Sequence, residues 1–188
     1  DAEGEPHGVE RERRDGPTGP TVRWTAEWQH GEWHGDSYLL DPQGRPVSVA
    51  RFEHGTGLDL WDDEVHPIVD GAQHGAVRWG DPCAPYEEEH YVGGLKHGPH
   101  RRWTEKGALE PDFPQFYVED EPVDRAEYAA ACAADPTLPP YKASDDSNRR
   151  TIPPALAEAR ARAAALADTF DLKAYLAAAD AAWLALFR

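Results

Sequence analysis

Two acidic runs, each followed by a histidine, are the residues of this sequence best suited to metal binding. Asp62-Asp63-Glu64 precedes His66, and Glu87-Glu88-Glu89 precedes His90. Carboxylate oxygens and an imidazole nitrogen together form a common ligand set for divalent cations. Runs of adjacent carboxylates in loops are also typical of a solvated surface, and this is the interpretation we favour. We therefore predict no metal site and no cofactor.

The motifs of the common enzyme classes are absent from the sequence. It has no G-x-S-x-G nucleophile elbow, no P-loop and no G-x-G-x-x-G fingerprint. Cys83 combined with His97 and His100 is a conceivable nucleophile pair, but no residue near Cys83 marks its thiol as activated. We therefore predict that the protein is not an enzyme and has no catalytic residues.

A recurring pattern accounts for three of the nine histidines. An aromatic or apolar residue is followed by a glycine three positions later, and by His-Gly three positions after that. The pattern starts at Trp28, Ile68 and Tyr91, with looser copies at Phe52 and Tyr117, so the starts are 16 to 26 residues apart. Such a period indicates a repeat architecture. The residues that define the repeat are Trp28, Gly31, His34, Gly35, Gly71, His74, Gly75, Tyr91, Gly94, His97, Gly98 and Trp103.

One unit of this pattern predicts a β-hairpin. The aromatic residue suits a half-buried strand. The first glycine opens a tight turn, since glycine adopts positive φ without steric cost. The His-Gly pair closes that turn and the next strand follows. Because no single hairpin buries its own apolar side, stability must come from neighbouring units.

In these residues the chain resembles the MORN repeat family, in the bacterial variant seen in antitoxin-like repeat proteins. The resemblance covers roughly residues 22–123. It departs from the pattern where Gly57 lacks a following histidine, where Asp120 replaces the first glycine, and at residues 82–89, which form an insertion. The resemblance implies an elongated antiparallel sheet of hairpins that acts as a scaffold or binding surface, and it implies no particular partner.

The domain organisation follows from changes in composition along the chain. Residues 1–20 are nearly free of apolar side chains and predict a flexible N-terminal arm. Residues 21–123 carry the repeats, with the last strand at 113–118. Residues 124–188 are rich in alanine and predict helices at about 125–134, 153–169 and 172–187. The fold class predicted is α+β, with C-terminal helices after the repeated hairpins.

The last predicted helix carries a bulky apolar stripe that needs a covering partner. One interpretation is that the helices cover the aromatic face of the sheet. The other is that the stripe binds another protein or a second copy of the chain. The candidate docking residues are Tyr175, Trp183, Leu186 and Phe187.

Charge narrows the choice of partner. The formal net charge is −16, from 35 acidic and 19 basic residues. This balance argues against nucleic acid and against anionic membranes, which both attract basic residues. A basic protein partner fits the charge, although the charge also serves solubility alone. The two cysteines, Cys83 and Cys132, are too few for a disulfide framework, and their spacing does not decide whether they pair; the cytoplasm is slightly favoured.

Two functions remain open at this point. The first is a non-catalytic scaffold that binds a protein partner or self-associates through the terminal helix. The second is an immunity or antitoxin-type inhibitor whose acidic surface occupies the basic site of a toxin such as a nuclease.

Overall fold

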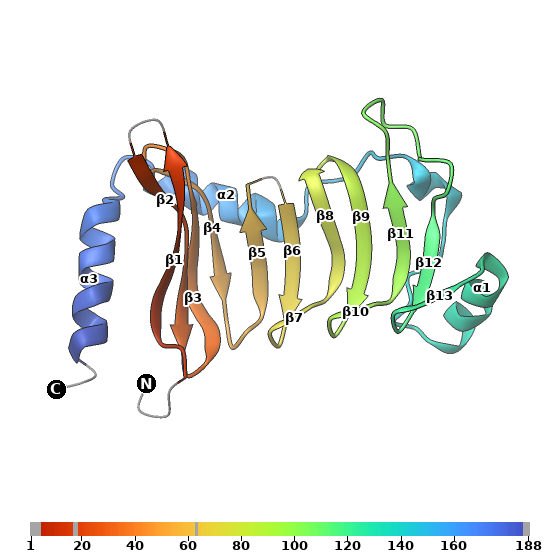
Figure 1. The fold of residues 1–188 in the computed structure, drawn as a ribbon, viewed down its shortest axis with the longest axis horizontal. Helices are drawn as coiled ribbons and strands as arrows, with labels where there is room; N and C mark the ends of the chain where they lie inside the picture. Colours follow the sequence, from red (N-terminus) through yellow and green to blue (C-terminus); the bar gives the residue numbers. More distant parts are fainter. Residues whose placement is uncertain (1–4, 17–18, 63, 186–188) are drawn as a thin grey trace. The chain divides into compact units, whose positions relative to one another are not determined.

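The protein has an α+β fold of antiparallel sheets and α-helices (Figure 1). The computed structural model describes residues 5–16, 19–62 and 64–185. The chain divides into two compact units: residues 1–62 together with 154–188, and residues 63–153. No helix in the described part of the chain is both long and apolar enough to cross a membrane.

The first unit is a sheet with helices on one face. Its core consists of Tyr38, Leu40 and Val49 from the strands and Ala163 from a helix, and Phe170 and Tyr175 pack against it. Helix α3 also contacts the edge strand β1. The elements are β1 (Gly8–Gly16), β2 (Gly19–Gln29), β3 (Glu32–Leu40), β4 (Pro46–Phe52), β5 (Gly57–Trp61), α2 (Pro154–Leu166) and α3 (Leu172–Ala185), with β1 to β4 hydrogen-bonded in that order.

An aromatic cluster lines the other side of this sheet. Trp24 of β2 stacks on Trp61 of β5 with 5.3 Å between ring centroids. Trp33 makes edge contacts with Trp24 and with Phe52. The stack thus joins β2 to β5, with β3 and β4 between them along the chain.

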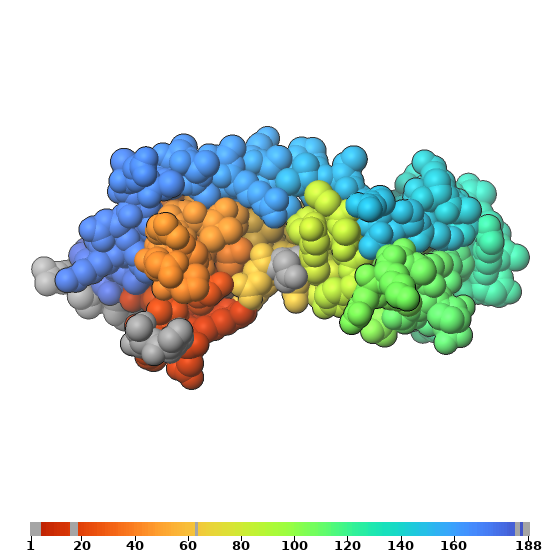
Figure 2. All heavy atoms as spheres, turned by 90° about the horizontal axis from the view of Figure 1, so that it is seen from above, coloured from red at the N-terminus to blue at the C-terminus, as the bar shows by residue number. Residues whose placement is uncertain are grey.

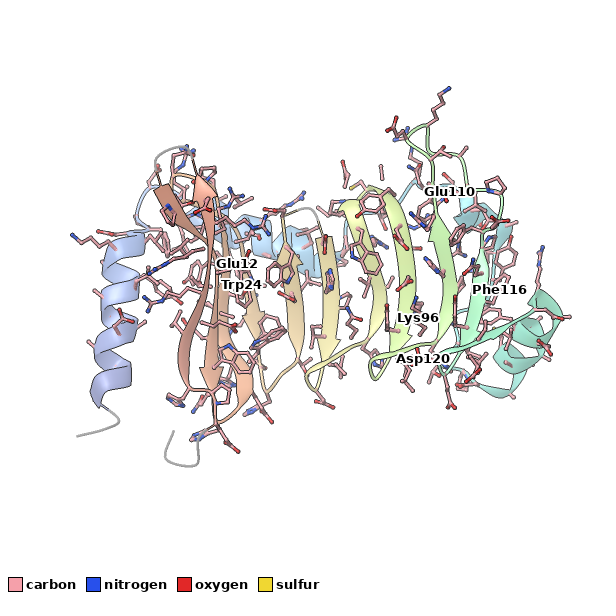
Figure 3. All side chains as sticks on the ribbon, viewed as in Figure 1. Glu12, Trp24, Lys96, Glu110, Phe116 and Asp120 are labelled. Carbon is pink, nitrogen blue, oxygen red and sulfur yellow. The ribbon has the colours of Figure 1, made fainter. Side chains whose placement is uncertain are left out.

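The second unit is a sheet in the order β13-β12-β11-β9-β8-β6, and the short strands β7 and β10 pair with β6 and β9. On one face Phe116 packs with Tyr128 and Leu138. The segment that follows Leu138 lies along the same side of the strands (Figure 2). The elements are β6 (Glu64–Val69), β7 (Ala72–Gln73), β8 (Gly75–Asp81), β9 (Ala84–Val92), β10 (Leu95–Lys96), β11 (Gly98–Arg102), β12 (Gln115–Val118), β13 (Glu121–Val123), α1 (Arg125–Ala134) and the 3-10 helix η1 (Ala143–Asp146).

The hairpin turns of the repeat share one backbone geometry. Both central residues of each turn have positive φ, the requirement of a two-residue type I′ turn, which matches the twist of its flanking strands. The φ angles are 49° and 80° at His30-Gly31, 49° and 77° at Asp70-Gly71, and 57° and 85° at Gly93-Gly94. The looser units turn in the same way at His54-Gly55 and Glu119-Asp120. The glycine of the pattern thus occupies the second turn position, and an aspartate occupies it in the last unit.

The histidine of the pattern connects one hairpin to the next. Nδ1 of His34 accepts a hydrogen bond from the backbone N–H of His54, the first turn residue of the following unit, at 3.3 Å. Nδ1 of His97 accepts the equivalent bond from Glu119 at 3.2 Å. In these two units the imidazole therefore joins one hairpin to the turn of the next, which gives it a structural role.

The predicted flexible arm over residues 1–20 is wrong for residues 8–16. These residues form β1, which pairs antiparallel with β2 from Gly8↔Trp28 to Gly16↔Gly19. Its charged side chains have partners within the unit, since Arg11 bonds Asp180 and Arg14 bonds Asp62. A composition without apolar residues was misleading because backbone pairing and ion pairs hold this edge strand.

The C-terminal helices begin and end close to the predicted positions, but they do not form one region. Helix α1 belongs to the second unit, and α2 and α3 belong to the first. Asp124 caps α1 in a capping box with Glu127. The last strand is β13, beyond the predicted final strand at 113–118. Cys83 and Cys132 are both free.

Candidate functional site

Three consecutive glutamates of β9 define the chemistry of the second unit. Side chains along a strand alternate between the two faces of a sheet. Glu87 and Glu89 therefore lie on one face, and Glu88 lies on the other. The two faces carry different partners.

The first face, here called the carboxylate face, consists of Glu87, Glu89, Tyr91, Lys96, His100 and Tyr117. Nε2 of His100 lies 2.7 Å from Oε1 of Glu87 and 3.3 Å from Oε1 of Glu89. Nζ of Lys96 lies 2.6 Å from the same Glu89 oxygen. The face reaches solvent, because the side chains of Lys96 and Glu87 are 33% and 23% exposed.

Aromatic rings complete the surroundings of the Lys96 ammonium. Nζ lies 5.2 Å from the centroid of the Tyr117 ring, within the range of a cation–π contact. The Tyr91 hydroxyl donates to Oε2 of Glu89. Burial raises the pKa of Tyr91, and the hydrogen bond and charge of Glu89 raise it further. Tyr91 therefore remains a protonated donor that fixes the orientation of Glu89.

A cation from the chain itself, the Lys96 ammonium, is bound on this face. One ligand atom from each of Glu87, Glu89 and His100 lies within 4.8 Å of the others, a grouping that could hold a metal ion. The Lys96 ammonium already bonds the oxygen of Glu89 that such an ion would share. A metal ion or an organic cation that binds there would have to displace the Lys96 ammonium from Glu89.

The opposite face carries an arginine cluster, defined as Arg78, Arg101 and Arg150 around Glu88. Arg150 donates to both Glu88 oxygens, from Nε at 2.7 Å and from one terminal nitrogen at 2.8 Å. Nε of Arg78 donates to Glu88 at 3.0 Å. Burial alone would raise the pKa of Glu88, but the hydrogen bond and charge of Arg150 and the charges of Arg78 and Arg101 outweigh it and lower the pKa. Glu88 is therefore ionised and holds residue 150 against the sheet.

The acidic runs considered as metal ligands do not gather as the sequence places them. His90 lies on the face opposite Glu87 and Glu89, and its Nδ1 donates to the carbonyl of His97 at 3.0 Å. His66 pairs with Glu64 at 3.1 Å. Asp62 accepts bonds from Arg14 and Arg23, and Asp63 lies outside the described residues.

The predicted docking residues of the last helix are only partly placed. Tyr175 packs on Tyr38 and Phe170, and its hydroxyl donates to Glu27 at 3.1 Å. This aromatic side chain therefore packs on the sheet of the first unit, and its contact with a partner stays a prediction. Trp183 lies in α3 but its side chain is outside the described part, as are Leu186 and Phe187.

The residues that define the repeat occupy turns and strand ends, not a shared site. Gly31, Gly71 and Gly94 are in turns, Trp28 ends β2, and Tyr91 lies in β9. Gly98 allows a close approach, since a Cβ there would lie 2.6 Å from the His90 Cβ. The remaining positions stand next to these: His34 and Gly35 in β3, His74 and Gly75 at the start of β8, and His97 and Trp103 on either side of β11.

Sequence reasoning missed Lys96, His100 and Tyr117 on the carboxylate face. Their distance along the chain hides the fact that β9, β10, β11 and β12 are neighbours in the sheet. A signal was present in the alternation of Glu87 and Glu89, which places both on the same face. The partners of Glu88 gave no comparable signal, because Arg150 comes from an irregular segment 62 residues away.

Comparisons with known proteins identify no relative of this chain. No family model, no curated protein and no solved structure matches it.

Proposed function

We propose that the protein is a non-catalytic binding scaffold, built on MORN-like hairpin repeats, that receives a lysine or arginine of a protein partner on its carboxylate face. The observation that carries this proposal is the position of Lys96. Its ammonium bonds Glu89 and lies over the ring of Tyr117. The ammonium of Lys96 is thus an example, within the chain itself, of the kind of cation that we propose the partner supplies.

The physical basis is a half-buried site for positive charge. Carboxylates shielded from water attract a cation more strongly than exposed ones, because the effective dielectric constant is lower. The Glu89 side chain is only 8% exposed. An aromatic ring adds a further contribution to the binding of an ammonium or guanidinium group. At longer range, the net charge of −16 would steer a basic partner toward the protein.

An immunity or antitoxin-type inhibitor is the second candidate, and the same charge favours it. A nuclease binds its substrate through basic residues. A carboxylate face with aromatic neighbours would occupy such a site without performing chemistry. The two candidates differ in outcome, since only the inhibitor abolishes an enzymatic activity of its partner.

We further propose a cytoplasmic location. Cys83 and Cys132 are both free, as is usual for proteins of a reducing compartment. A peptide-mapping experiment under non-reducing conditions tests this: a Cys83–Cys132 disulfide in the protein isolated from its natural source would contradict it.

A labelled octalysine peptide tests the proposed cation site directly. Fluorescence anisotropy should show binding to the protein that weakens as salt is added, since exposed charges are screened. The double variant Glu87→Gln/Glu89→Gln should lose roughly tenfold or more in affinity, because hydrogen bonds to charged groups contribute about 1.5–3 kcal/mol each. Melting curves of both proteins establish that the fold is kept.

The matched control removes the same charge from another surface. Glu105 and Glu121 are both exposed, so Glu105→Gln/Glu121→Gln should bind octalysine within about twofold of the wild type. Equal losses in both double variants would show that the peptide responds to net charge only, and the proposed site would be wrong. Inhibition of a basic nuclease by the wild type, lost in Glu87→Gln/Glu89→Gln, would select the inhibitor over the scaffold.

A further inference from the structure

The arginine side of the second unit contains a cavity that the proposed function does not use. It has a volume of about 390 Å³ and lies between strands β8, β9 and β11 and residues 139–151. Four arginines line it: Arg78, Arg101, Arg149 and Arg150. The unit has many more acidic than basic residues, so a group of four arginines around one cavity calls for a physical explanation.

Charge at this cavity is not balanced by the chain. Glu88 and Asp145 also line it, and Asp146 accepts a bond from Nε of Arg101 at 3.4 Å. Four guanidinium groups therefore face three carboxylates. Surplus positive charge around a partly enclosed site attracts an anion.

Among the three arginines around Glu88, Arg101 uses its hydrogen-bonding capacity least. The residue is only 5% exposed. Its terminal nitrogen lies 3.6 Å from Glu88, which is longer than a hydrogen bond, and Nε makes its single bond to Asp146. A guanidinium group has five N–H donors. Arg150, in contrast, places its donors on Glu88 and on the carbonyls of Asp145, Ser147 and Arg149.

Arg149 supplies a second cation to the cavity without a structural duty. It is exposed, and its guanidinium makes no hydrogen bond or ion pair with any residue in the described part of the chain. Only its backbone is engaged: the N–H donates to Ser147 and the carbonyl accepts from Arg150. Arg101 at the inner wall and Arg149 at the rim thus leave donors for a ligand.

We propose that this cavity binds a phosphate group, either as free phosphate or as a phosphate monoester. Guanidinium groups bind phosphate through paired, charge-assisted hydrogen bonds. A phosphate dianion has several acceptor oxygens and so engages Arg101 and Arg149 together. A carboxylate, that of Glu88, is already bound by the arginine cluster. The rings of Pro99, Pro139 and Pro140 form apolar wall beside the arginines, which accommodates the organic part of an ester.

The test is a calorimetric titration of the full chain with inorganic phosphate and, separately, with phenyl phosphate. We expect one site per chain. The substitution Arg149→Gln should weaken binding at least about tenfold, since it removes a charged donor. Because Arg149 supports no other residue through its side chain, this variant should fold and melt as the wild type does.

Arg102→Gln is the matched control. Arg102 is the neighbour of Arg101 in β11, but it lies on the opposite face, where it pairs with Glu87. Its loss should leave phosphate affinity within about twofold, because screened charge at that distance contributes little. In parallel, the Nε–H resonance of Arg101 should shift on addition of phosphate.

Each outcome of these measurements decides the proposal. Tighter binding of phenyl phosphate than of inorganic phosphate identifies a monoester as the ligand, and the reverse order identifies free phosphate. No binding of either probe at millimolar concentration, or equal losses in Arg149→Gln and Arg102→Gln, would overturn the site. Because octalysine binding depends on the other face, failure here leaves the proposed cation site intact.

Discussion

The two faces of the second sheet give the same residue type opposite tasks. Glu87 and Glu89 lie on the carboxylate face, where their neighbours are His100, Lys96 and aromatic rings. Glu88 lies between them in sequence, yet it faces three arginines. The difference teaches that the role of a carboxylate here is set by the alternation of the strand and by what the chain places across from it.

The two environments also differ in what holds the charges. Glu88 bonds Arg150 through both carboxylate oxygens, and Arg150 in turn bonds backbone carbonyls of its own segment. This network ties residues 145–150 to the sheet. On the carboxylate face, Lys96 is one-third exposed and Glu87 nearly one-quarter. One face is therefore organised for stability, and the other keeps charge accessible.

The largest expected effect is a loss of stability on replacing Glu88, compared with the loss on replacing Glu87. Glu88→Gln leaves three guanidinium groups without their shared anion and should lower the free energy of unfolding by about 3–5 kcal/mol, as for other broken buried ion pairs. Glu87→Gln should cost about 1 kcal/mol, since its partner His100 keeps a hydrogen-bond acceptor. Urea denaturation of the three proteins measures both values. Similar losses for the two variants would erase the contrast between the faces.

An intermediate loss of stability is expected when the pH is lowered. The pKa of Glu88 is below its ordinary value of 4.5 in the folded protein. The stabilisation it provides is therefore complete above the ordinary pKa, and is lost as pH falls from there through the lowered value. Each pKa unit of lowering corresponds to about 1.4 kcal/mol.

Denaturation of the wild type and of Glu88→Gln at a series of pH values between about 7 and 3 measures this loss. The gap in stability between the two proteins should narrow as the pH falls below the ordinary pKa. A gap that stays constant over that range would show that the ionisation of Glu88 does not stabilise the fold.

The smallest expected effect concerns Lys96. Lys96→Gln removes a partly exposed ion pair, so stability should change by less than about 1 kcal/mol. The affinity for octalysine should rise roughly threefold, because Glu89 loses its internal partner and a like charge is removed. Anisotropy titrations measure the change, with Lys106→Gln as a control of equal charge, since Lys106 is exposed in the turn before Gly107. Unchanged or weaker octalysine binding by Lys96→Gln would mean that Lys96 does not occupy the position of the partner's cation.

Much of the fold could be predicted from local sequence because its signals are local. Glycine at a turn position and proline or aspartate at a helix start each have a conformational cause within a few residues. The turns at Gly31, Gly71 and Gly94 and the helices α1, α2 and α3 follow from such signals. β1 has no apolar pattern: it is held by pairing with β2, and its arginines contact Asp62 and Asp180, which are far away in sequence.

The candidate sites could not be predicted to the same extent, since they depend on strand pairing. The sequence grouped Glu87, Glu88, Glu89 and His90 as one acidic run, and the pleat divides them. The register Arg101↔Glu88 and Arg102↔Glu87 decides which basic residue meets which carboxylate. A shift of one residue would exchange the faces, and bulges of the kind found between Trp79 and Gly80 cause such shifts.

The two imidazole bridges between hairpins run in the same direction along the chain. His34 and His97 each provide an acceptor for the hairpin that comes after, at His54 and Glu119. In the same hairpin pairs, the N–H of Gly55 and Asp120 donate to the carbonyls of Trp33 and Lys96. If one unit were duplicated and inserted between two others, it would carry the residues for the hydrogen bonds to both of its neighbours. Proteins of this design can therefore lengthen by duplication of about two dozen residues without new chemistry at the junctions.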